Sequence, residues 1–341
     1  MLRIIFLHSE LSGYFLRCCR ELKQSGCELS IAALPAASNA PYELASDGLT
    51  IDLNPPDLKQ LVADFRPDCM VIAGWWNSSY LTEAQRAVTL GIPVIMTCDE
   101  KWVGTLKQRL KLTWIRGRVR NAATHFWVPG LPHYPIAKYL GFPPSKILTG
   151  VYSCDFDAFS KSPAHLKSET PHFLFVGRME SVKGLNVLID AYQKYRRLVQ
   201  NPWDLKLVGA GSLAGFINST PNVQYTPFVQ PDQLPQVLSA ASAFVMPSVN
   251  EPWCVAIHEA AAAGLPIICS NVCGASAHLV FHNQNGMIFQ ANKSDELTDC
   301  LLRVHHLRSD ILLQWGELSR HLAGQFTPHR WVQCVREIAG G

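Results

Sequence analysis

The stretch FLFVGRMESVKG, residues 173–184, decides the fold class of the second half of the chain. Its apolar run ends at Val176, and Gly177 then permits a tight turn before an amphipathic segment begins. A strand, a turn and a helix in that order form the unit from which parallel α/β sheets are built. The loop carries Arg178 and Lys183, which we therefore expect at the carboxyl end of a strand, where such sheets bind ligands.

Short apolar runs alternate with longer amphipathic segments on both sides of this stretch. A segment rich in serine, proline and charge, residues 156–171, interrupts the alternation and indicates a linker. We therefore predict an α/β chain with two tandem Rossmann-like domains, residues 1–155 and 172–326, and a ligand site in the cleft between them. A final helix within 327–341 is expected to pack back on the first domain. Strands are predicted at residues 3–7, 28–34, 69–73, 93–97, 124–128, 172–176, 205–208, 243–246, 266–269 and 287–289.

The composition narrows the class of protein. The chain has 30 Lys and Arg against 27 Asp and Glu, and a net charge of +3 is too small to indicate a nucleic-acid partner. Its 11 cysteines are irregularly spaced and several lie in apolar runs, which is typical of reduced thiols in a cytoplasmic protein without disulfides or a zinc site. We also expect no signal peptide and no membrane-spanning helix, because the apolar runs are too short.

A second stretch, PSVNEPWCVAIHEAAAAGLPIICS at residues 247–270, contains two glutamates on a predicted helix. Pro252 fits the opening turn of this helix, so Glu251 is expected at its entrance and Glu259 about one to two turns inside. The backbone amides of residues 253–255 would then point out of the helix N-terminus, which favours the binding of an anion.

The two stretches together supply the groups that a nucleotide diphosphate requires. Arg178 and Lys183 suit a diphosphate leaving group because they offset its developing negative charge. Glu251 can meet a sugar hydroxyl while Glu259 meets a ribose diol. The alternatives are an exposed loop with ordinary basic residues and a helix-start acid followed by a surface acid.

Read in order, these motifs resemble the retaining glycosyltransferases of family four. They are FVGR with Lys183, LVGAGSL, PSVNEPW with Glu259, and AAAGLPII, and their order and spacing match over residues 172–290. The resemblance implies the GT-B fold, with an N-terminal acceptor-binding domain and a C-terminal domain that binds a nucleotide sugar. It implies a hexosyltransferase of EC 2.4 type in polysaccharide biosynthesis, without metal or other cofactor. The acceptor would be a glycan, a lipid-linked sugar or a small molecule.

The resemblance assigns roles to individual residues. Arg178 and Lys183 correspond to the diphosphate-binding pair. Glu251 corresponds to the glutamate that contacts the transferred sugar, and Glu259 to the glutamate that holds the ribose. Further substrate contacts are expected at Gly177, at Phe228 and Val229 beside the base, at Asn250, Pro252, Trp253, Cys254 and Val255 around the helix entrance, and at Gly13 after the first strand.

Two departures from the family pattern affect the expected activity. Cys254 stands where the family usually has glycine, directly after EPW. A histidine that many members carry after the fourth strand is missing, and Asp99 in the comparable stretch either takes a polar role toward the sugar or acceptor or is a solvated loop acid. The alternatives are therefore a catalytically weak or silent sugar-nucleotide-binding protein and a GT-B-fold nucleotide-sugar epimerase.

Two other segments suggest further ligands. LVGAGSLAG, residues 207–215, has the glycines of a dinucleotide fingerprint, but no acid ends the next strand, so a nicotinamide cofactor is not expected. Residues 101–120 contain seven basic residues, two tryptophans and no acid. They form either a partly buried helix that lines the acceptor cleft or a peripheral contact with the inner face of a membrane. One predicted stripe holds Trp102, Leu106, Leu110 and Trp114, and a second holds Leu112, Ile115 and Val119.

Overall fold

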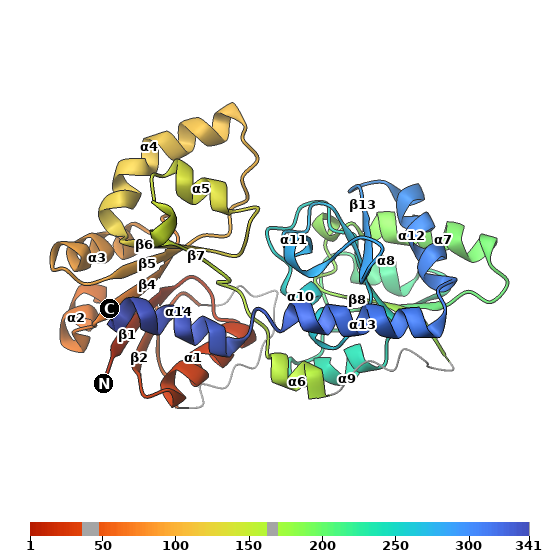
Figure 1. The fold of residues 1–341 in the computed structure, drawn as a ribbon, viewed down its shortest axis with the longest axis horizontal. Helices are drawn as coiled ribbons and strands as arrows, with labels where there is room; N and C mark the ends of the chain where they lie inside the picture. The colour runs from red at the N-terminus through yellow and green to blue at the C-terminus, as the bar shows by residue number, and fades with distance from the viewer. Residues whose placement is uncertain (36–47, 162–169, 341) are drawn as a thin grey trace. The chain divides into compact units, whose positions relative to one another are not determined.

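The computed structural model describes residues 1–35, 48–161 and 170–340 (Figure 1). The chain forms two compact units, and each is built around its own parallel sheet. Unit 1 consists of Met1–Ser153 together with Pro328–Gly341, and unit 2 of Cys154–Thr327. The prediction of an α/β chain with two Rossmann-like halves is confirmed. No helix in the described ranges is both long and apolar enough to cross a membrane.

Unit 1 contains a seven-stranded sheet in the order β3-β2-β1-β4-β5-β6-β7, and every pair of neighbouring strands is parallel. The strands are β1 Arg3–His8, β2 Glu28–Ala33, β3 Thr50–Leu53, β4 Cys69–Ala73, β5 Val94–Thr97, β6 His125–Val128 and β7 Ile147–Thr149. The helices are α1 Gly13–Gln24, α2 Leu58–Phe65, α3 Ser78–Thr89, α4 Leu106–Ala122, α5 Tyr134–Tyr139 and α14 Pro328–Gly340, with a 3₁₀ turn at Pro144–Lys146.

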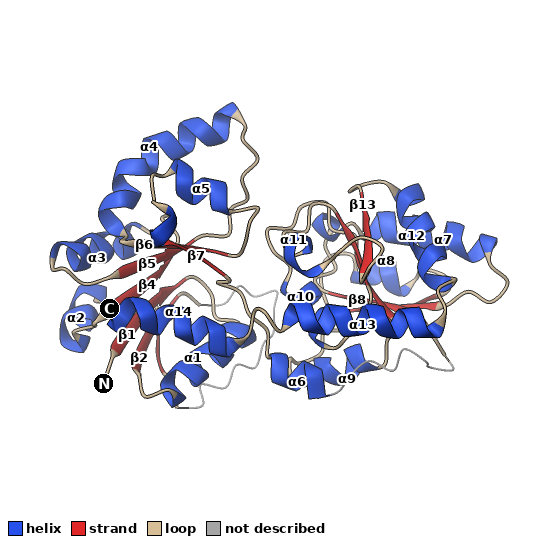
Figure 2. Ribbon diagram, viewed as in Figure 1, coloured by secondary structure: helices blue, strands red, loops and turns tan. Residues whose placement is uncertain are grey.

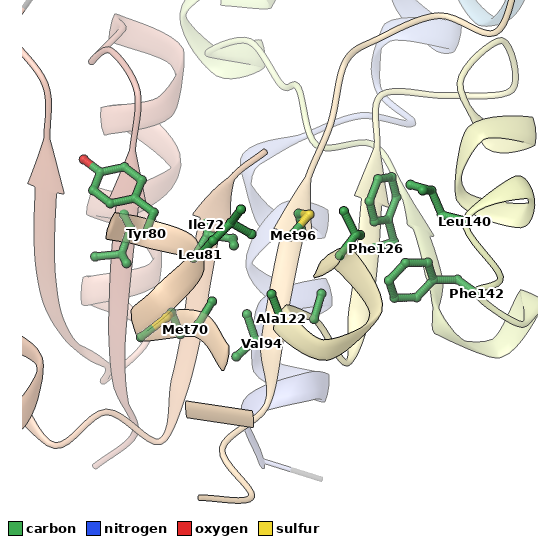
Figure 3. Packing of buried hydrophobic residues seen from close by; sticks show 14 of the residues in the cluster. Met70, Ile72, Tyr80, Leu81, Val94, Met96, Ala122, Phe126, Leu140 and Phe142 are labelled. Atoms are coloured by element: carbon green, nitrogen blue, oxygen red, sulfur yellow. The ribbon is translucent and has the colours of Figure 1, made fainter. Parts of the chain in front are cut away.

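The sheet of unit 1 is buried on both faces, as its apolar strands require. Ile5 and Leu7 of β1 point into one core, to which α2, α3, α4 and α5 contribute. Figure 3 shows part of this core, where Ala122 of α4 lies among side chains of β4, β5 and β6. The alternate residues Ile4 and Phe6 point into a second core, which α1 and α14 cover.

The last helix belongs to unit 1. Trp331 of α14 stacks on Phe6, with ring centroids 5.8 Å apart, and it also contacts Trp127. Its indole Nε1 donates a hydrogen bond to the carbonyl oxygen of Val151 at 3.1 Å. Because Trp331 is only 4% exposed, α14 is an integral part of the core of unit 1.

Unit 2 contains a six-stranded parallel sheet in the order β10-β9-β8-β11-β12-β13. Figure 2 distinguishes the strands, in red, from the helices, in blue. The strands are β8 His172–Val176, β9 Asp204–Val208, β10 Val223–Thr226, β11 Ala243–Met246, β12 Ile267–Ser270 and β13 Gly286–Phe289. The helices are α6 Phe156–Lys161, α7 Leu185–Leu198, α8 Ala214–Asn218, α9 Leu234–Ser239, α10 Val255–Ala262, α11 Ser276–Leu279, α12 Ser294–His305 and α13 Ser309–Ala323, with a 3₁₀ turn at Ser181–Lys183.

The predicted linker, residues 156–171, is wrong over its first part. Phe156–Lys161 forms helix α6, which packs against α9 and α10 inside unit 2. The helix is stabilised by the burial of Phe159, whose side chain is 4% exposed, and by Asp155, whose carboxylate accepts from the amide of Ala158 at 3.4 Å. Residues 162–169 of the predicted linker lie outside the described residues.

Candidate functional site

The strand order of unit 2 reverses between β8 and β11, which lie side by side in the sheet. In open parallel sheets such a switch point leaves a crevice at the carboxyl ends of the strands, and ligands bind there. The loop that leaves β8 is residues 177–184, and the loop that leaves β11 is residues 247–254. Most of the predicted site residues therefore lie at the position in unit 2 where the topology favours a ligand.

The two loops are joined through their backbones. The amide of Val249 donates to the carbonyl oxygen of Val182 at 2.9 Å. Gly184 adopts a φ of +68°, and a Cβ at this position would clash with the carbonyl oxygen of Pro247. Glycine at 184 thus permits the close approach that brings the end of the first loop against the second.

This approach places Lys183 beside Glu251. Lys183 Nζ and Glu251 Oε2 form an ion pair, and the two side chains are only 13% and 12% exposed. The Ser248 hydroxyl donates to the same carboxylate oxygen at 3.3 Å, and Ser270 Oγ donates to the Ser248 carbonyl oxygen at 2.5 Å. Burial alone would lower the pKa of Lys183, but Cys254 and Glu251 together raise it above its ordinary value. The lysine is therefore held in its charged form.

Arg178 lies near the same pair. Its side chain is exposed, and its charge opposes the rise in the pKa of Lys183. The backbone that carries Arg178 is fixed by the loop after β9, because Met179 donates to Ala210 at 2.8 Å. A Cβ at Gly209 would clash with the carbonyl oxygen of Gly177, so the glycines of LVGAGSLAG serve this close packing of two loops. The structure thus brings three of the predicted charged residues together.

The entrance of α10 differs from the prediction. The helix begins at Val255, and Pro252 does not occupy its opening turn. The reason is that the preceding residues run beside another loop: the carbonyl oxygens of Glu251 and Trp253 accept from the amides of residues 274 and 275, at 3.2 and 2.9 Å. Cys254 then precedes the helix with a φ of 87° and a ψ of 85°. A side chain rarely adopts this region, which favours glycine.

Glu259 lies inside α10 and is half-buried. Burial raises its pKa to about 8. No hydrogen bond or ion pair holds its carboxylate among the residues that the structure describes. The structure therefore does not join Glu259 to the Lys183–Glu251 pair, and its carboxylate has acceptor capacity left for a ligand.

The other predicted contacts in unit 2 differ in their access to a ligand. Phe228 and Val229 lie in the loop after β10 and are partly exposed, and Asn250 is exposed. Trp253 is 2% exposed, and its ring packs 5.8 Å from His278 and 5.9 Å from Phe326. Its side chain therefore serves the packing of unit 2, and the contact predicted for Trp253 through its backbone amide stays a prediction.

The predicted residues of unit 1 lie at the carboxyl edge of the other sheet. Gly13 is the first residue of α1. Asp99 follows β5, is exposed, and accepts a hydrogen bond from the Tyr152 hydroxyl at 2.9 Å. His8 ends β1, stacks on Phe15 with centroids 4.0 Å apart, and has its pKa lowered to about 4 by burial.

Sequence reasoning missed three polar residues near these positions. Ser248 lies two residues after the end of β11, and a hydroxyl placed so soon after a buried strand is a signal that could have identified it. His8 ends the first strand and could have been found in the same way. Tyr152 contacts Asp99 from a distant part of the chain, so no local pattern indicates it.

The match to a known protein family falls within unit 2. The model of the family described as glycosyl transferases group 1 matches residues 157–321. O-antigen chain mannosyltransferase B of Escherichia coli is 26% identical over 226 residues, which cover 59% of this chain and 55% of that protein. The chain spans about half the length of the curated relatives it matches.

Two solved structures resemble the chain over nearly its whole length. HepE of Anabaena, in complex with UDP, has a TM-score of 0.73 at 17% identity and covers 99% of both chains. Sucrose-phosphate synthase of Thermosynechococcus elongatus has a TM-score of 0.75 at 16% identity, over 99% of this chain and 98% of that one. These likenesses confirm the predicted GT-B fold. Through residues 157–321, the chain is similar to the glycosyl transferases of group 1.

Proposed function

We propose that this protein is a retaining, metal-independent glycosyltransferase. It would move a hexose-type sugar from a nucleotide diphosphate to a glycan, lipid-linked or small-molecule acceptor. The observation that carries the proposal is the Lys183–Glu251 ion pair at the switch point of unit 2, with Arg178 beside it. The group 1 family and the UDP bound to HepE support a nucleotide sugar as the donor.

The ion pair is suited to exchange partners when a donor binds. Lys183 and Glu251 neutralise each other in the ligand-free protein. A diphosphate carries more negative charge than one carboxylate, so it competes for Lys183 and recruits the exposed Arg178. Glu251 is then free to accept a hydrogen bond from a sugar hydroxyl, while Ser248 continues to orient its carboxylate.

Transfer would proceed at the face of the sugar from which the diphosphate leaves. The bond between C1 and the phosphate oxygen breaks, and Arg178, Lys183 and the amides at the start of α10 offset the charge that develops on the diphosphate. The acceptor hydroxyl attacks C1 on the same face and passes its proton to the leaving phosphate oxygen. Glu251 is engaged by Lys183 and Ser248, which favours a positioning role over nucleophilic attack.

The first experiment identifies the donor. A thermal-shift screen against UDP-, GDP- and ADP-sugars should yield one base that stabilises the protein, because a ligand at 100 times its dissociation constant adds about 2.7 kcal/mol. Transfer from that donor to candidate acceptors is then followed by NMR, with and without EDTA. We expect the anomeric configuration of the donor to be kept and EDTA to have no effect. An inverted product would overturn the retaining assignment, and loss of turnover in EDTA the metal-independent one.

Cys254 favours a second candidate function. A side chain at a φ of 87° narrows the helix entrance where the backbone would approach the sugar, so the protein could bind a sugar nucleotide without moving the sugar. Donor binding in the thermal-shift screen, combined with neither transfer nor slow hydrolysis of the donor, would support this silent binder. Hydrolysis or transfer by the purified protein would exclude it.

A further inference from the structure

Helix α4 carries two apolar faces that point in opposite directions. Leu112, Ile115 and Val119 are at most 7% exposed and lie in the core of unit 1. Leu106, Leu110 and Trp114 are 74%, 63% and 77% exposed. At about 100° per residue these three side chains form one row on the side of the helix opposite the core. The structure thus shows that the first stripe packs inside unit 1 and that the second is exposed to water.

The exposed row lies between two rows of cations. The same helical geometry places Lys107, Lys111 and Arg118 along one side of it. Arg109, Arg116 and Arg120 lie along the other side, and all six side chains are exposed. Among the residues that the structure describes, Lys111 pairs with Glu100 at 2.6 Å, and no carboxylate forms an ion pair with the other five.

We propose that this face of α4, which we call the α4 surface, binds the surface of an anionic lipid bilayer. The α4 surface consists of Leu106, Leu110, Trp114 and the six flanking cations. The apolar row would enter the boundary between head groups and acyl chains, a depth that tryptophan favours. The cations on both sides would then meet lipid phosphates, since a helix that lies in the membrane plane presents both flanks to the head groups.

The charges disfavour the other occupants of such a surface. A second copy of the chain on a two-fold axis would set the same cations of each α4 surface against one another, and the helix contains no acid to compensate. A nucleic acid would meet the exposed leucines and tryptophan first, because they stand at the outermost position of the helix between the cations. A bilayer satisfies both the apolar row and the cations. The proposal does not depend on the transferase activity.

Vesicle flotation tests the proposal on the whole protein. Vesicles of phosphatidylcholine alone and of phosphatidylcholine with phosphatidylglycerol are compared at low and high salt. We expect the protein to float only with the anionic vesicles, and less at high salt, because salt screens the attraction between cations and lipid. The absence of binding to anionic vesicles at low salt would overturn the proposal.

Two variants separate the contributions of the apolar row and the cations. The triple variant Leu106→Ser, Leu110→Ser, Trp114→Ser should bind anionic vesicles at least about tenfold more weakly, because it loses the inserted side chains. The double variant Lys107→Gln, Arg118→Gln should bind about 25-fold more weakly, since each cation near an anionic surface contributes about fivefold. Both should unfold at the temperature of the parent, because the replaced side chains are exposed.

Matched controls replace exposed residues of the same kinds elsewhere in the chain. Leu53→Ser with Leu198→Ser, and Lys59→Gln with Lys293→Gln, should float like the parent. Unchanged flotation of the triple serine variant would overturn the proposal. The proposal would also be overturned if light scattering showed that the parent is a dimer and the triple serine variant a monomer, while both bind vesicles equally. The thermal shift with the nucleotide sugar should be the same in all variants. A failure of the membrane proposal can therefore be distinguished from a failure of the proposed donor site.

Discussion

Lys183, in the loop that leaves β8, forms an ion pair with Glu251, in the loop that leaves β11, and both side chains are largely buried. The pair therefore joins the two loops in addition to offering charges to a ligand. Replacement of either partner alone leaves a largely buried charge without its counterion, which is costly. Effects on transfer and on folding must for this reason be measured separately at this site.

Lys183→Ala should lower transfer by a factor on the order of 10² to 10³, because the cation that offsets the charge of the leaving diphosphate is lost. It should also lower the free energy of unfolding by about 1–3 kcal/mol, because Glu251 loses its partner. The double variant Lys183→Met, Glu251→Gln should regain most of this stability and remain inactive. Urea unfolding and steady-state kinetics measure the two effects. Full activity of the double variant would contradict the assignment.

Arg178→Gln provides the contrasting case. Arg178 is exposed, so its replacement should change the free energy of unfolding by less than about 0.5 kcal/mol. We expect donor binding to weaken, because one of the cations proposed to meet the diphosphate is removed. Calorimetric titration with the donor found by thermal shift measures this. An unchanged dissociation constant would place the diphosphate away from Arg178.

Glu259→Gln should change how stability depends on pH. The pKa of Glu259 is raised from 4.5 to about 8, so between these values the folded chain holds a proton that the unfolded chain has released. The stability of the parent should therefore fall as pH rises through this window. The variant should match the parent near pH 4.5 and exceed it above pH 8 by an amount on the order of a few kcal/mol. Urea unfolding at both pH values tests this.

The same carboxyl gives a prediction for ligand binding. A ribose diol that donates hydrogen bonds to Glu259 stabilises its charged form, so donor binding should release a proton and tighten as pH rises toward about 8. Glu259→Gln should remove this pH dependence. Titration calorimetry in buffers of different ionisation enthalpy detects the proton. Equal proton release by parent and variant would show that Glu259 does not hold the ribose.

Substitutions at Cys254 should follow backbone geometry. At a φ of 87° glycine is unstrained, so Cys254→Gly should relieve about 1 kcal/mol of strain, offset in part by the lost packing of a buried thiol. Cys254→Val should lower the free energy of unfolding by about 2 kcal/mol or more, because a β-branched side chain fits this region poorly. We expect the glycine variant to keep or gain transfer activity. A valine variant as stable as the parent would show that the loop accommodates a side chain freely.

The sequence predicts best those elements in which an apolar run ends at a marked turn. Strand β8 and the loop through Gly177 to Lys183 are of this kind, because burial on both faces of a parallel sheet requires a continuous apolar run. The short strands β3 and β7 were not predicted, because they lie at the edges of their sheet and are partly exposed, so they carry no such run. Helix α6 was not predicted, because the polar composition of the segment that contains it indicated a linker.

Contacts between distant segments explain the remaining differences at the site. Periodicity could not place Pro252 correctly, since the backbone of residues 251–253 is fixed by hydrogen bonds to residues 274 and 275. It identified two apolar stripes on α4 but could not tell which of them packs on the sheet. The Tyr152–Asp99 hydrogen bond likewise depends on the folded sheet and has no local pattern.

Helix α14 has a consequence for how the protein is made. Its residues Trp331, Val332 and Val335 complete the second core of unit 1, yet the ribosome synthesises them after the whole of unit 2. Unit 2 is continuous in the chain and can fold while this segment is still in the exit tunnel, as domains generally fold in units. Until α14 emerges, the part of the second core that it covers stays exposed to water, although α1 already packs on the same face of the sheet. Unit 1 can therefore complete its core only after unit 2 has been translated, although its own translation begins first.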